Sequence, residues 1–114
     1  MSFRWTTKDP DESLDYSIDW FRFLDTATIS SVTWSVQTPE IGKTTLAAGQ
    51  TLTTASSNAV TDSIQNIAQT NTDTVATINL GGGVLNREYI FTCNIVDSTG
   101  SQAERTVKMR IREN

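Results

Sequence analysis

The sequence predicts an all-β domain, an immunoglobulin-like antiparallel β-sandwich with an N-terminal arm and a longer insertion around residues 43–73. Five segments alternate apolar and polar residues, which is the period of a half-buried strand. Threonine supplies 19 of the 114 residues, and β-branched side chains favour strands. Turn residues separate the segments. A chain of this length forms one domain, with the arm at 1–13 and the sandwich at 14–114.

The composition argues against catalysis and against several kinds of ligand. The chain has no histidine, so the commonest general base and metal ligand is missing. Its one cysteine cannot form an internal disulfide or a thiolate zinc site. A formal net charge of -4 opposes binding to nucleic acid or anionic lipid. We therefore expect a non-enzymatic interaction module, made in the cytoplasm because no signal peptide is evident, with no cofactor, small-molecule substrate or membrane span.

The first two predicted strands follow the arm. Residues 14–20 place their apolar side chains on one face and aspartate or serine on the other. Phe21 and Phe23 continue on the opposite parity, which a bulge or burial of both faces near the strand end would explain. Residues 28–36 form the second strand, with valine and tryptophan on its apolar face.

The segment 43–73 supports more than one interpretation. Val60, Ile64, Ile67 and Ala68 recur at helical spacing, which is the one observation that supports one or two helical turns. The many Thr, Ser and Asn residues around them weaken a helix. A long polar loop or an extra hairpin is the alternative.

Three further strands complete the sandwich. Residues 74–80 alternate again, and glycines 81–83 end that strand with a turn that needs positive φ. Residues 89–97 are apolar on both faces, which indicates a central strand. A turn at 97–100 then leads to the strand 103–112, so the last two strands form a hairpin.

The apolar positions of these strands define a candidate core. Tyr89 stands where immunoglobulin-type sandwiches place a tyrosine whose hydroxyl ties a connecting loop to the domain. Cys93, inside the central strand, is a small buried hydrophobe rather than a nucleophile, because no histidine can activate it. The predicted core residues are Tyr16, Ile18, Trp20, Trp34, Tyr89, Phe91, Ile95, Val107, Met109 and Ile111.

The arm holds the candidate interaction residues. Phe3 and Trp5 lie outside the core pattern and are hot-spot candidates, or else they cap the domain's own core. Asp9, Asp11 and Glu12 could share a calcium ion, but their spacing is not that of an EF-hand, so a solvated or interfacial patch is favoured. The candidate protein-interface residues are Phe3, Trp5, Lys8, Asp9, Asp11 and Glu12.

Two other motifs have simple interpretations. Residues 41–45 read like the end of a phosphate-binding loop but lack its first glycine, so a basic turn is expected. Lys108, Arg110 and Arg112 form a basic stripe on the last strand. The stripe either protects an edge strand or meets the acidic run of the same or a neighbouring chain.

Two segments carry a resemblance to a known family. The run K-D-P-D-E at 8–12 and the strand L-D-Y-S-I-D-W at 14–20 resemble the phage fibre–tail adaptor proteins of tailed bacteriophages. A later I-x-S-x-x-W segment, which ends at Trp34, is similar in kind. The order of strands and glycine turns after residue 74 also follows the family, whereas 43–73 is longer than its usual connection.

The resemblance implies a bacteriophage virion structural protein, assembled in the cytoplasm of the bacterial host. Such a protein would dock tail fibres or neighbouring proteins onto the tail or neck, and its partners would be other virion proteins in a symmetric multimer. A capsid decoration (cement) protein of the phage head is an alternative. A carbohydrate-binding host-recognition module is an alternative of another class.

Overall fold

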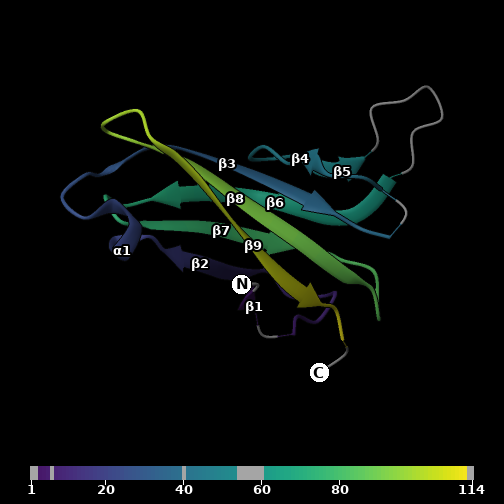
Figure 1. The fold of residues 1–114 in the computed structure, drawn as a ribbon. Coiled ribbons are helices and arrows are strands. Elements are labelled where there is room, and N and C mark those ends of the chain that lie inside the picture. Colours follow the sequence, from purple (N-terminus) through teal and green to yellow (C-terminus); the bar gives the residue numbers. More distant parts are fainter. Residues whose placement is uncertain (1–2, 6, 40, 54–60, 113–114) are drawn as a thin grey trace.

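Two β-sheets pack face to face in this chain (Figure 1). The computed structural model describes residues 3–5, 7–39, 41–53 and 61–112. Within them one sheet has the order β1-β9-β8-β3-β4, formed by β1 (Phe3–Arg4), β3 (Ile29–Gln37), β4 (Thr44–Thr45), β8 (Glu88–Asp97) and β9 (Gln102–Arg110). The other has the order β2-β7-β6-β5, formed by β2 (Leu14–Asp19), β5 (Thr51–Thr53), β6 (Thr61–Asn71) and β7 (Val75–Gly81).

The strand order is that of an immunoglobulin-type sandwich. The row β2-β7-β6 corresponds to strands B, E and D, and the row β3-β8-β9 corresponds to C, F and G. β8 lies between β3 and β9, so it is the central strand that its two apolar faces predict. The predicted all-β sandwich is therefore confirmed. The pairing of β1 with β9 is parallel, while the other strand pairs are antiparallel.

The core lies between the sheets, where the inward positions of each strand meet. Every core residue named from the sequence is at most 6% exposed: Tyr16, Ile18, Trp20, Trp34, Tyr89, Phe91, Ile95, Val107, Met109 and Ile111. Trp5, half-buried, adds its ring, which stacks on Tyr16 at 4.8 Å and lies 5.6 Å from Phe91. The N-terminal segment thus contributes to the core.

The middle of the chain is a hairpin, which was one of the interpretations that the sequence left open, and the alternative of one or two helical turns is wrong. β6 pairs with β5 and β7. Ile64 and Asn66 face inward, which leaves Ile67 on the outer face, where it is 44% exposed. The register shifts between Asn66 and Ala68, so Ala68 is exposed as well. Ile64, Ile67 and Ala68 therefore do not share one buried face, as a helix would require. Val60 lies outside the described residues.

The switch of parity after β2 is a helical turn rather than a bulge. α1 (Phe21–Leu24) begins directly after the strand, and the carboxylate of Asp19 accepts a hydrogen bond of 2.9 Å from the Phe21 N–H. Leu24 is buried, whereas Phe21 is 62% and Phe23 is 40% exposed. Both explanations offered from the sequence, a bulge and burial of both faces, are therefore wrong.

The described part of the predicted arm lies along β9. Phe3 pairs with Val107 where β1 lies parallel to β9, and the Trp5 N–H donates a hydrogen bond of 2.9 Å to the Lys108 carbonyl. An isolated bridge joins Lys8 to Ile111. These contacts hold the segment against the sheet.

Candidate protein-binding site

Lys8 does not offer a surface contact in this chain, although the sequence made it a candidate. Its side chain is 0% exposed, and its ammonium donates to the carbonyls of Gly82 at 2.6 Å and Asp9 at 2.8 Å. Burial lowers the pKa of Lys8, and the nearby Glu12 and Asp9 carboxylates oppose that shift. Lys8 is a tie between the N-terminal segment and the loop after β7.

The acidic run forms a local turn. The Glu12 carboxylate accepts a hydrogen bond of 3.2 Å from the Asp9 N–H, and the Asp9 carboxylate accepts one of 2.9 Å from the Asp11 N–H. Asp11 and Glu12 are exposed, and Asp9 is half-buried. Among the described residues, no group of three or more His, Cys, Asp or Glu could hold a metal ion. The side chain of Phe3 lies outside what the structure describes.

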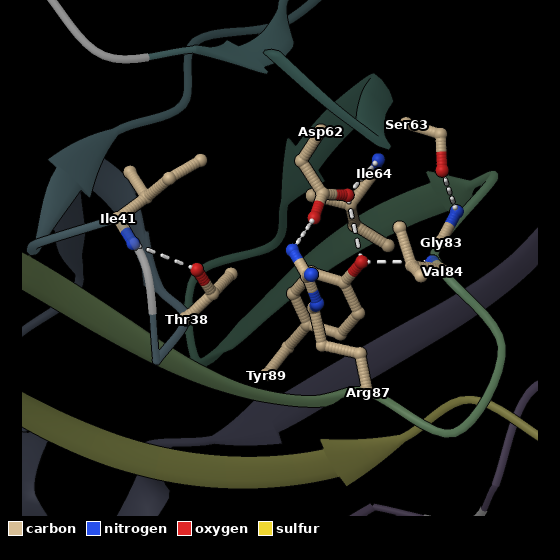
Figure 2. A network of polar contacts seen from close by, with 9 residues as sticks. All are labelled: Thr38, Ile41, Asp62, Ser63, Ile64, Gly83, Val84, Arg87 and Tyr89. Carbon is tan, nitrogen blue, oxygen red and sulfur yellow. Dashed lines mark hydrogen bonds and ion pairs between the residues drawn. The ribbon is translucent and has the colours of Figure 1, made fainter. Parts of the chain in front are cut away.

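A buried polar network surrounds Tyr89 (Figure 2). Its hydroxyl donates a hydrogen bond of 2.7 Å to Asp62 and accepts one of 2.8 Å from the Val84 N–H. Arg87 pairs with the other Asp62 oxygen at 2.8 Å. Burial, and then the bond to Asp62, raise the pKa of Tyr89 well above its usual range. The hydroxyl therefore ties the loop after β7 to the start of β6, which is the role predicted for Tyr89.

This network is structural, although it gathers an acid, a phenol and a guanidinium. The Asp62 side chain is fully buried and also accepts 2.8 Å from the Ile64 N–H (Figure 2). Nearby, the Gly83 N–H donates a hydrogen bond of 3.1 Å to the Ser63 hydroxyl, and the Thr38 hydroxyl accepts one of 2.9 Å from the Ile41 N–H. The polar atoms are thus paired with each other. Asp62 was missed because the helical interpretation hid its inward parity two residues before Ile64.

Cys93 offers no reactive group either. It is buried in β8, and burial raises the pKa of its thiol to about 12. A thiol with that pKa carries almost no thiolate near neutral pH. It packs as the small hydrophobe that the sequence predicts.

Three connections meet at one end of the sandwich, which we call the loop end: residues 20–28 with α1, the turn 72–74 and the turn 98–101. The Trp20 N–H donates a hydrogen bond of 2.8 Å to the Thr74 carbonyl, and the Ser98 N–H donates one of 2.8 Å to the Thr28 carbonyl. Figure 1 shows α1 and the β8–β9 turn at this end, away from both ends of the chain. In immunoglobulin variable domains the corresponding end carries the binding loops.

The loop end exposes aromatic side chains. Phe21 and Phe23 are exposed on α1, while Leu24 and Trp20 anchor the turn in the core. The ring of Phe23 meets Trp20 edge to face at 6.0 Å. Large apolar side chains with a polar rim mark interaction sites. α1 is therefore the best candidate contact surface among the described residues.

A cleft of about 440 Å³ borders α1 and is lined by Asp19, Phe21, Arg22 and Arg105. Arg105 stacks over the Trp20 ring at 4.7 Å and donates 3.2 Å to the Asp19 carbonyl. The guanidinium is thus held in place beside an exposed phenyl ring. Arginine and aromatic side chains are the commonest hot spots of protein interfaces.

The sequence did contain a signal for this surface. The parity switch at Phe21 and Phe23 marks a break in the strand, but parity alone suggests a bulge or burial of both faces rather than a helical turn. Asp19 stands two residues before Phe21 and accepts a hydrogen bond from its N–H, and such an aspartate favours a helical turn there.

Comparison with known proteins identifies the family. None of the helices in the described ranges has the length and apolar character needed to cross a membrane. A search of the curated proteins finds no match to this chain. The family described as "Podophage GP4 fiber-tail adaptor protein gp77" matches residues 8–57 and 41–110, which together span all but the two ends of the chain. The chain therefore belongs to the podophage GP4 fibre–tail adaptor protein gp77 family.

Proposed function

We propose that this chain is a non-enzymatic structural adaptor of the phage virion, which docks a tail fibre or a neighbouring protein onto the tail or neck. Family membership over residues 8–110 supports an adaptor role. The observation that favours a docking surface is the exposed pair Phe21 and Phe23 on α1. Docking through a rigid sandwich needs no chemistry, and the buried ionisable groups around Tyr89 serve the fold.

An adaptor has to contact two neighbours, and the sandwich has two ends. β2 starts at Leu14, opposite Leu80, and β7 continues into the loop that exposes Val84 (38%) and Leu85 (45%). The Asn86 N–H, 2.8 Å from the Ile111 carbonyl, places this loop beside the segment of Lys8. We place the second contact here, together with the exposed acids of the turn at 9–12. Weak contacts at both ends become strong when a symmetric particle repeats them.

The loop end can be tested with a double variant, Phe21→Ser with Phe23→Ser, in a phage whose own copy of the gene is deleted. The variant should fold, because neither side chain is buried, and its particles should lack the chain or the fibre. Ile67→Ser is the matched control, since Ile67 is also an exposed apolar side chain but lies on β6. Particles made with the control should have normal composition.

Cryo-electron microscopy of purified virions tests the location. Density for the chain at the tail or neck, in copies that match the tail's rotational symmetry, supports the adaptor. Density over the icosahedral shell would instead make it a capsid decoration protein. If the chain is absent from the particle, or if the double variant assembles normally and binds host polysaccharide less well, the proposal is wrong.

A further inference from the structure

β2 is an uncovered edge of the four-stranded sheet. It pairs with β7 from Leu14–Leu80 to Asp19–Val75, and no described strand lies on its other side. Immunoglobulin-type sandwiches usually place strand A there. Here β1 pairs with β9 in the other sheet. The position beside β2 is therefore open in the part of the chain that the structure describes.

The N–H and C=O groups of Asp15 and Ser17 point away from β7, toward the open edge of the sheet. The Trp20 N–H donates a hydrogen bond to the carbonyl of Thr74, the residue before β7. The N–H and C=O groups of the even-numbered residues of β2 therefore point toward β7, and those of the odd-numbered residues point away from it. No hydrogen bond within the described ranges reaches the N–H or C=O of Asp15 or Ser17. A row of unpaired main-chain groups is a template for a further strand.

Other strand edges in the described ranges are covered in part. Phe3 and Arg4 pair with the last part of β9, and Lys8 forms a bridge with Ile111 just beyond it. On β3, the Leu46 N–H donates 2.9 Å to the Trp34 carbonyl, and the Gln69 amide donates 3.3 Å to the Val32 carbonyl. β2 has the guanidinium of Arg105 at its last residue instead, and the rest of its edge has no such cover.

The side chains of β2 indicate the chemistry of an added strand. Asp15 and Asp19 are exposed on the outer face, and the strands of this sheet contain no Lys or Arg. Opposite charges across neighbouring strands stabilise a sheet, and like charges destabilise it. A second copy of β2 fits badly, because antiparallel pairing centred on Ser17 would set each Asp15 opposite an Asp19. The edge suits a strand that carries Lys or Arg on its outer face.

We infer that β2 binds an extended, basic segment of a neighbouring virion protein, which adds to the four-stranded sheet as an extra strand. Main-chain hydrogen bonds to Asp15 and Ser17 would supply affinity, and the two aspartates would supply the preference for basic residues. This inference rests on the proposed function, because it needs a neighbour in the particle. It adds a third contact surface, on the side of the sandwich rather than at its ends.

Ser17→Pro tests the edge directly. Proline removes the outward N–H of Ser17 but no hydrogen bond to β7, and edge strands tolerate proline in this orientation. Ser17→Ala is the matched control, because it loses the 2.8 Å hydroxyl bond to Thr77 and keeps the N–H. Each variant is supplied to a phage whose own copy of the gene is deleted. With Ser17→Pro, the number of copies of this chain, or of one other tail protein, should fall at least tenfold per particle. Ser17→Ala should leave the composition unchanged.

Hydrogen exchange of the wild-type chain provides a second measurement that needs no variant. Amides of the peptide 14–19 should exchange more slowly in assembled particles than in the isolated chain. Normal composition with Ser17→Pro, or unchanged exchange on assembly, overturns the inference even if the chain is present in the tail. Absence of the wild-type chain from particles overturns the proposed function itself. Thermal unfolding of both variants separates a folding defect from a docking defect.

Discussion

The ammonium of Lys8 donates a hydrogen bond of 2.6 Å to the carbonyl oxygen of Gly82, 74 residues away in the chain. This bond joins the N-terminal segment, which lies along β9, to the loop that follows β7. It therefore links the five-stranded sheet to the four-stranded sheet at the end opposite α1. Three predictions test this region.

Lys8→Met should lower the free energy of unfolding by about 1–3 kcal/mol, because the Gly82 carbonyl loses the donor that the buried Lys8 side chain supplies. Lys43→Met is the control, since Lys43 lies at the surface in an ion pair of 3.5 Å with Glu104. Its loss should cost no more than about 1 kcal/mol. Urea unfolding of both variants measures the difference. Equal losses would show that the Lys8 bonds contribute nothing beyond those of a surface lysine.

Tyr89→Phe should destabilise the domain by about 1–3 kcal/mol at neutral pH, because Asp62 and the Val84 N–H lose a buried partner. It should also change the response to alkali. The folded pKa of Tyr89 lies above the ordinary value of 10.0, so the unfolded phenol ionises first and stability falls as pH rises past about 10.

The wild-type free energy of unfolding should therefore decrease more steeply between about pH 9.5 and 11.5 than that of Tyr89→Phe. Urea unfolding at several pH values in this window measures both slopes. Tyr16, whose pKa burial also raises, is present in both proteins and cancels in the comparison. Parallel slopes would be evidence against a buried, protonated Tyr89.

Gly82→Ala should lower the free energy of unfolding by about 2–4 kcal/mol. Gly82 has a φ of +70°, and an added Cβ would lie 2.0 Å from the Ser63 carbonyl oxygen. Gly42→Ala is the control, because nothing lies within 4 Å of its added Cβ. A thermal melt should show a large drop for the first variant and almost none for the second. A stable Gly82→Ala domain would contradict this account of the turn.

The sequence could predict the strands whose alternation is unbroken. β2, β8 and β9 each keep their period of two, because every second residue meets the other sheet. β6 does not, since its register shifts between Asn66 and Ala68 and its apolar residues recur at helical spacing. No local pattern distinguishes such a bulge from a helical turn. The pairing with β5 and β7 decides between them.

Contacts between distant segments were beyond a sequence interpretation. The parallel pairing of β1 with β9 depends on a register between the two ends of the chain. The burial of Lys8 depends on carbonyl acceptors, which every residue has and no side-chain pattern reveals. At the loop end, the break at Phe21 was visible, but its exposure follows from the helical turn that Asp19 starts.

The parallel pairing of β1 with β9 also sets an order of events during synthesis. Phe3, Arg4 and Lys8 leave the ribosome early, yet their main-chain partners on and after β9 are made last. The Trp5 N–H likewise has its acceptor only once Lys108 has been made. A chain cut short before Val107 lacks the main-chain partners that hold this segment against the sheet. Closure of the sandwich thus reports that translation has passed β9.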